Sequence, residues 1–107
     1  MSLDFSLMVT MPTEVFSANI THNLNRMAEE AGIYDFLWHP DILGVTTASQ
    51  MIKPLTDALV LMRSDPERFK KFNAPNGWGM YEHFIDFVEE VLTGCKENPD
   101  ATIEVSR

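Results

Sequence analysis

The sequence predicts an α+β fold in which a small two- or three-stranded antiparallel sheet, formed by both chain ends, packs against about three helices. Two observations lead to this prediction. Apolar and polar residues alternate at both ends of the chain, which is typical of half-buried strands. Between the ends, apolar residues recur at helical spacing, which is typical of helices that bury one face.

The first strand is expected near the N-terminus, where every second residue is apolar: Leu3, Phe5, Leu7, Val9 and Met11. Pro12 and Thr13 interrupt this pattern. Residues 15–20 contain β-branched and aromatic side chains, so they are expected to pair back on the first strand as a hairpin. Near the other end, Ile103 and Val105 alternate with polar residues, which predicts a last strand that returns to pair with the first.

The first helix is expected from about Thr21, because the apolar residues that follow share one helical face: Leu24, Met27, Ala28 and Ala31. Gly32 is placed to end this helix in the left-handed conformation. Residues 33–38 are rich in large apolar side chains. This composition predicts a short helical turn that fills the core and stops before Pro40.

A second helix is predicted from Thr47, which has the spacing of a capping box with Gln50. Pro54 lies inside the apolar pattern of this helix. Since proline lacks an N–H donor and clashes with the preceding turn, we expect a kink or a break into two helical pieces there. Asp65 and Pro66 are suited to an N-cap and a first turn, and they predict a further short helix.

The third long helix is expected over about residues 80–95 and follows a loop at residues 73–79. Acidic residues occupy one side of this helix, and the other side is an apolar stripe of Tyr81, Phe84, Ile85, Val88, Val91, Leu92 and Cys95. The stripe indicates the face that is buried.

Composition excludes several classes of protein. The chain has 107 residues, 8 Lys and Arg against 16 Asp and Glu, and a single Cys. This length suits one hydrophobic core, so a single domain over residues 1–107 is expected. A net charge of −8 argues against direct nucleic-acid binding and against docking on an anionic membrane. With no internal disulfide, no apolar run of membrane-spanning length and no export signal, a cytoplasmic protein is expected.

The charge is polarised along the chain. Both ends are acidic, whereas the middle holds a basic island of Lys53, Arg63, Arg68, Lys70 and Lys71. This pattern leaves open a charge-complementary self-association into a homo-oligomer, for which Phe36 and Phe87, expected to be exposed, are candidate contacts.

The most unusual local segment spans residues 76–82 and reads Asn-Gly-Trp-Gly-Met-Tyr-Glu. Two glycines flank Trp78 just before a helix, so the backbone can take positive φ and leave N–H groups free at the helix start. Trp78 could then stack a planar ligand that Asn76 orients, with Tyr81 and Glu82 nearby. The alternative is that Trp78 fills the core and the glycines only permit a tight turn.

A second candidate lies at the junction of strand and helix, at Thr21, His22 and Asn23. A histidine exchanges protons near neutral pH, so His22 with Glu82 forms a conceivable acid and base pair if the fold brings them together. The alternative is that Thr21 or Asn23 caps the helix and that His22 makes an ordinary hydrogen bond.

Other chemistry finds little support in the sequence. The three histidines are scattered, and one cysteine cannot form a structural zinc site, so no metal is expected. Cys95 lies on an apolar stripe, where a thiol is inert. No phosphate-binding or dinucleotide-binding motif occurs, so no cofactor is expected. The acids along the third helix and its exit form either a solvated face or a mimic of a phosphate track: Glu82, Asp86, Glu89, Glu90, Glu97 and Asp100.

Three segments of the chain resemble a family of small uncharacterised proteins of bacteria, phages and other mobile elements. The most specific is the Asn-Gly-Trp-Gly-x-Tyr-Glu segment, and the others are residues 21–24 and 99–107, which end in Val-Ser-Arg. The resemblance covers most of the chain after the first strand. The family has no assigned activity, so the resemblance implies only a phage or prophage setting and a greater weight on Asn76, Trp78, Tyr81 and Glu82.

The leading hypothesis is a cytoplasmic binding or interaction protein, without enzymatic activity, that recognises a protein partner or a small ligand. An alternative is a nucleotide-like or metabolite-like ligand site, with weak hydrolytic chemistry, formed by the junction at residues 21–23 and the segment at residues 76–82. The site residues expected there are His22, Asn23, Asn76, Trp78, Tyr81 and Glu82. A third hypothesis is an acidic phage-type antagonist that mimics nucleic acid.

Overall fold

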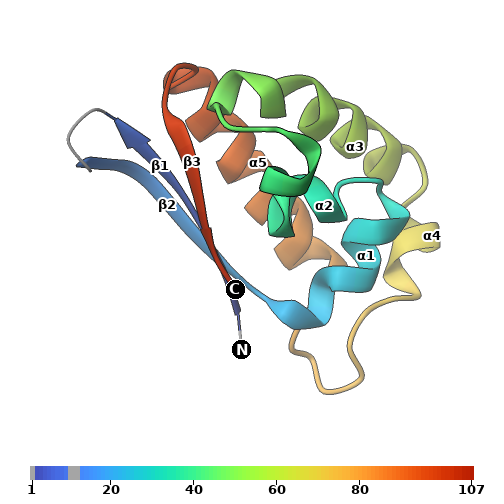
Figure 1. The fold of residues 1–107 in the computed structure, drawn as a ribbon. Coiled ribbons are helices and arrows are strands. Elements are labelled where there is room, and N and C mark those ends of the chain that lie inside the picture. The colour runs from blue at the N-terminus through green and yellow to red at the C-terminus, as the bar shows by residue number, and fades with distance from the viewer. Residues whose placement is uncertain (1, 10–12) are drawn as a thin grey trace.

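Both ends of the chain contribute to one sheet, whose central strand is the first one. The computed structural model describes residues 2–9 and 13–107. Strands β2 (Thr13–Thr21), β1 (Ser2–Val9) and β3 (Thr102–Ser106) lie in the order β2-β1-β3, and both pairs are antiparallel (Figure 1). The predicted α+β fold is confirmed, and its sheet has three strands.

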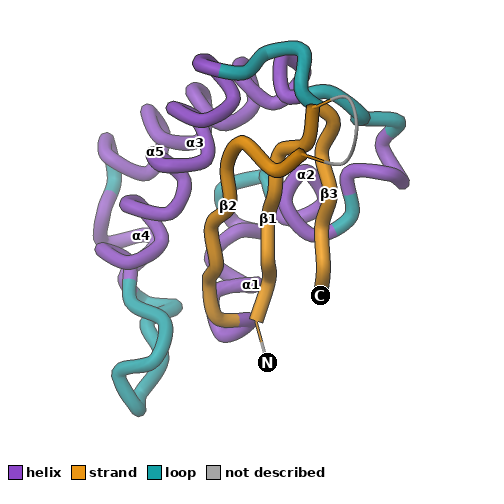
Figure 2. Tube along the Cα trace, turned by 90° about the vertical axis from the view of Figure 1, so that its left-hand side faces the viewer, coloured by secondary structure: helices purple, strands orange, loops and turns teal. Residues whose placement is uncertain are grey.

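One face of the sheet is apolar because the alternation in β1 continues across its neighbours. Leu3, Phe5 and Leu7 are fully buried. Their partners across the sheet are also apolar: Ile20, Ala18 and Phe16 on β2, and Val105 and Ile103 on β3. All the helices cover this face, and the opposite face is bare (Figure 2).

The predicted burial of Val9 is wrong. The ends of β1 and β2 project past the helices, so no layer covers Val9, which is 41% exposed (Figure 1). The register also shifts there, because Leu7 pairs with Phe16 whereas Met8 pairs with Glu14. The extra residue makes a bulge in β2. The expected roles of Met11 and Pro12 lie outside the described residues.

The helices follow the predicted order along the chain. They are η1 (His22–Leu24), α1 (Asn25–Glu30), α2 (Tyr34–Trp38), η2 (Pro40–Leu43), η3 (Ala48–Met51), α3 (Ile52–Ser64), α4 (Pro66–Lys70) and α5 (Tyr81–Glu97), where η marks a 3-10 helix. Gly32 follows α1 with φ +77°, as predicted for a left-handed helix end. Asp65 stands at the N-cap of α4, although its side chain makes no capping hydrogen bond.

The expected break near Pro54 lies between η3 and α3, two residues before the proline. Pro54 itself occupies the first turn of α3, where the helix does not use the N–H that proline lacks. The capping box is present at the start of η3. Gln50 Oε1 accepts hydrogen bonds from the backbone N–H groups of Thr46 (2.8 Å) and Thr47 (3.0 Å).

Helix α5 lies at the centre of the core, with the sheet on one side and α3 on the other. This position explains one wrong prediction. Phe87, expected to be exposed, is only 3% exposed, because two neighbouring layers bury a wider band of α5 than the apolar stripe alone indicates. Phe36 is half-buried against the core as well. Neither residue is therefore a freely exposed dimer contact.

Within the described part of the chain, no helix combines the length and the apolar character that crossing a membrane requires.

Candidate functional site

The loop between α4 and α5 is closed by its own hydrogen bonds. The N–H of Ala74 donates to the carbonyl of Gly79 (3.1 Å), and the N–H of Gly77 donates to the carbonyl of Ala74 (3.0 Å). Asn76 Oδ1 accepts a hydrogen bond from the N–H of Trp78 (3.0 Å). These bonds hold the backbone on both sides of Trp78, so the segment that carries the indole is ordered by the chain itself.

The same loop is tied to the rest of the molecule at two points. Asn73 Oδ1 accepts a hydrogen bond from the N–H of Tyr81 (2.7 Å) at the start of α5. Asn23 Nδ2 donates to the carbonyl of Trp78 (2.8 Å), and this bond joins the loop to the junction between β2 and η1. The fold therefore brings Asn23, Asn76 and Trp78 together, as the two candidate segments suggested.

Gly79 is needed where the loop meets this junction. Its φ of +116° is one that residues with side chains rarely adopt. A Cβ atom there would also lie 3.0 Å from Cβ of Asn23 and 3.4 Å from side-chain atoms of Leu24 and Thr21. Glycine thus permits both the turn and the close approach of the loop to residues 21–24.

Beside the loop lies an open hollow of about 490 Å³, lined by Ser2, Asn19, Thr21, His22, Asn23 and Trp78. Trp78 is 72% exposed, which is the highest value for any large apolar side chain in the described residues. The alternative that Trp78 fills the core is therefore wrong. Trp38 takes that role instead and is 2% exposed.

His22 turns one edge of its ring toward the core. Its ring meets that of Trp38 edge-on, with centroids 6.1 Å apart and planes at 67°. Its Nε2 atom is buried and has no hydrogen-bond partner among the described residues. His22 as a residue lines the hollow, but this buried nitrogen is not part of the surface of the hollow.

Tyr81 and Glu82 do not line the hollow. The Tyr81 side chain is buried, and its hydroxyl donates to the carbonyl of Met62 (2.8 Å). Burial raises the pKa of this hydroxyl. Glu82 is exposed in the first turn of α5. No hydrogen bond joins His22 to Glu82 in the described structure, so their pairing as acid and base has no geometric support.

Ser2 and Asn19 also line the hollow, and no pattern in the sequence predicts this. Asn19 Nδ2 donates to Ser2 Oγ (2.9 Å) and to Asp4 Oδ1 (2.5 Å) across the bare face of the sheet. Strand alternation places these residues opposite the apolar set. The alternation predicts that both residues lie on the polar face of the sheet. It does not predict that this face lies next to Trp78.

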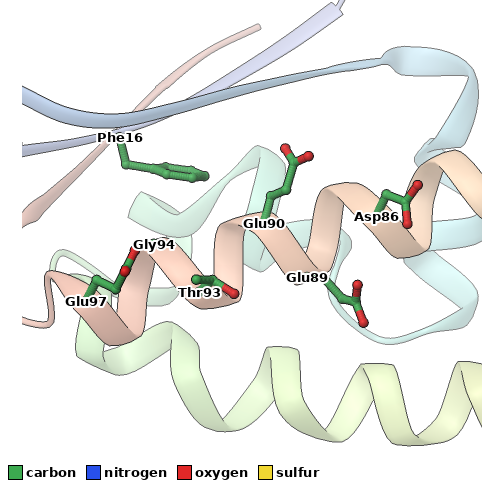
Figure 3. A pocket seen from close by; sticks show the side chains of 7 residues that line it. All are labelled: Phe16, Asp86, Glu89, Glu90, Thr93, Gly94 and Glu97. Atoms are coloured by element: carbon green, nitrogen blue, oxygen red, sulfur yellow. The ribbon is translucent and has the colours of Figure 1, made fainter.

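A second concave surface lies between β2 and α5 (Figure 3). This acidic groove has a volume of about 430 Å³ and is lined by Phe16, Asp86, Glu89, Glu90, Thr93, Gly94 and Glu97. Glu90 points toward β2, whereas Glu89 points away from it and forms an ion pair with Arg63 of α3 (Figure 3). Part of the acidic side of α5 therefore lines a concave surface and is not an evenly solvated helix face.

Metal and thiol chemistry receive no support from the geometry. In residues 2–9 and 13–107, no three His, Cys, Asp or Glu side chains are grouped so that they could hold a metal ion. Cys95 is buried, and burial raises the pKa of its thiol to about 12, so the thiol is protonated at neutral pH.

Comparisons with known proteins gave no match. No family model matches the chain, and neither a curated protein nor a solved structure is similar enough to count as a relative.

Proposed function

We propose that the protein is a binding module without enzymatic activity, and that Trp78 is the residue by which it recognises a partner protein. The observation that supports this proposal is an indole that is 72% exposed on a loop closed by hydrogen bonds. Exposed tryptophans contribute strongly to interfaces, because their large rigid surface is buried at little cost in side-chain entropy.

Photo-crosslinking tests this proposal. A photoreactive phenylalanine analogue replaces Trp78 in one preparation and Ile42 in a second, because Ile42 is 69% exposed but lies on η2 outside the hollow. We expect one protein to be labelled from position 78 and not from position 42. Excess unlabelled wild-type protein should compete for this product, whereas the Trp78→Ala protein should not. Equal labelling from both positions, or no competed product, would refute the proposal.

A small-molecule ligand is the second candidate, and the hollow of about 490 Å³ beside Trp78, which is lined mostly by polar residues, favours it. Trp78 would stack a planar group, while the amides of Asn19 and Asn23 would orient its polar atoms. Thermal-shift screening against nucleotides and metabolites tests this idea, since a ligand at 100 times its Kd stabilises by about 2.7 kcal/mol. A hit whose shift persists in the Trp78→Ala and His22→Phe variants does not bind in the hollow.

A narrower candidate is an antagonist that presents carboxylates in place of phosphates, and the acidic groove on α5 favours it. Such a protein should compete with DNA or RNA for a basic partner, and the competition should weaken as salt is raised. Competition that does not depend on salt would count against mimicry.

A further inference from the structure

Within the part of the chain that the structure describes, the outer edge of β2 has no backbone partner. β2 has nine residues, and it pairs with β1 on one of its two sides. In the described residues, no backbone hydrogen bond joins β2 to any segment other than β1. A long unpaired strand edge is a template for another strand, and proteins usually block such edges with lysines, prolines or a covering segment. Along residues 16–21 this edge carries no charged residue and no proline.

The register shows which backbone groups are free. The N–H of Ile103 on β3 donates to the carbonyl of Thr46, on the side away from β1 (2.9 Å). Along a strand, the N–H and C=O groups of successive residues point alternately to its two sides. Because the backbone groups of Ile103 point away from β1, those of Phe5, and of every second residue before and after it on β1, point toward β2. By the same alternation, the N–H and C=O groups of Ser17 and Asn19 point outward from the free edge.

The acidic groove lies directly beneath this edge (Figure 3). Phe16 on β2 rests its ring on α5 at Gly94, where a Cβ atom would lie only 2.7 Å from the ring. Because glycine allows this contact, the strand sits close to the helix, and the carboxylates of Asp86 and Glu90 lie beside the edge. A strand added to β2 would therefore direct every second side chain toward carboxylates.

Charge decides between the possible occupants of this edge. If a second copy paired its own β2 antiparallel to this one, both helix layers would lie on the same side of the joined sheet. The two α5 helices would then be neighbours, and their acidic stripes would repel each other. A basic segment would instead be attracted to this edge, because its positive charges complement the carboxylates of the groove.

We propose that the free edge of β2 binds an extended basic segment of a partner protein as a fourth strand of the sheet. Backbone groups of Ser17 and Asn19 pair with the segment, and basic side chains at alternate positions reach Asp86 and Glu90. Alternate side chains of a strand are about 6.7 Å apart, and helix residues four apart are separated by about 6 Å along the axis, so the two spacings match. This surface shares Asn19 with the Trp78 hollow, but it uses the backbone of Asn19 and not Trp78, so the inference does not depend on the proposed function.

The test uses a labelled nine-residue peptide in which lysine alternates with threonine, titrated against the full chain by fluorescence anisotropy. We expect binding that weakens with salt, and a Kd at least about threefold higher for the variant Asp86→Asn/Glu90→Gln. The control variant Asp41→Asn/Glu104→Gln removes two carboxylates beside the opposite edge of the sheet. It should keep the Kd within about twofold of the wild-type value.

Backbone methylation of the peptide separates strand pairing from simple charge attraction. In one peptide all lysine amides carry a methyl group, and in a second peptide all threonine amides do. Each set of methyl groups blocks a different side of the added strand. One of these two peptides should lose binding and the other should keep it. With bound peptide, the amide protons of Ser17 and Asn19 should exchange more slowly with solvent.

Three results would overturn the proposal. The first is equal binding of both methylated peptides, and the second is no effect of the Asp86→Asn/Glu90→Gln change. The third is a dimer, seen by sedimentation, in which the amides of Ser17 and Asn19 are already protected without peptide. That result would assign the edge to a second copy of the chain.

Discussion

Replacing Tyr81 by phenylalanine removes one hydroxyl group. In the structure this hydroxyl hydrogen-bonds to a backbone carbonyl near the end of α3. In a continuing helix the carbonyl of Met62 would accept from the N–H of residue 66, but Pro66 has no N–H. The Tyr81 hydroxyl donates to this carbonyl instead, in a buried hydrogen bond of 2.8 Å. The Tyr81→Phe variant therefore leaves a buried carbonyl without a donor.

The expected loss in the free energy of unfolding is about 1–3 kcal/mol, which is the usual cost of an unpaired buried polar group. For a domain of this size, 1 kcal/mol lowers Tm by roughly 4 °C, so the Tm should fall by about 4–12 °C. Thermal and urea unfolding followed by circular dichroism measure both quantities.

Tyr34→Phe is the matched control, because the Tyr34 hydroxyl makes a longer and only partly buried contact with His39 Nε2 (3.3 Å). The control should lose less than the Tyr81→Phe variant. If the two variants lose the same stability, the helix-end role of Tyr81 is refuted. If Tyr81→Phe instead alters ligand binding at unchanged stability, Tyr81 belongs to the binding site.

Three further predictions concern the core, the loop and a helix start. Because the pKa of the Cys95 thiol is raised from 9.0 to about 12, its stabilising contribution is complete below pH 9 and is lost as pH rises toward 12. The fall in unfolding free energy over this range should be shallower in Cys95→Ala, and equal slopes would contradict the raised pKa. Gly79→Ala should cost more than Gly77→Ala, because both have positive φ but only Gly79 is crowded, and differential scanning calorimetry compares them. Gln50→Ala should cost about 1 kcal/mol in urea unfolding, since two N–H groups lose their acceptor, and no change would exclude the capping box.

Much of the fold follows from local patterns in the sequence. Leu3, Phe5 and Leu7 are fully buried because strand alternation alone decides which side of a strand is apolar. Gly32 ends α1 because only its own backbone conformation is involved. The errors at Val9 and Phe87 have the opposite cause, because burial there depends on which layers of the fold lie nearby, and a periodicity contains no such information.

The candidate site was predictable only in part. The unusual composition around Trp78 marked the loop, and the polar junction marked Asn23. The hydrogen bond between Asn23 and the Trp78 carbonyl joins residues 55 positions apart, so no local pattern indicates it. The same reasoning applies to Ser2 and Asn19, which reach the hollow only through the sheet. Tyr81 and Glu82 are close to Trp78 in sequence, but the start of α5 directs Tyr81 into the core.

The most direct test of the central claim is the affinity of the crosslinked partner, once purified, for wild-type, Trp78→Ala and Ile42→Ala proteins by isothermal titration calorimetry. A tryptophan that dominates an interface contributes about 2 kcal/mol or more, so Trp78→Ala should raise Kd by roughly 30-fold or more. The Tm of this variant should stay close to that of the wild type, because the indole is 72% exposed. Ile42→Ala should leave Kd unchanged. A Kd for Trp78→Ala within about twofold of wild type would contradict the claim that Trp78 carries recognition.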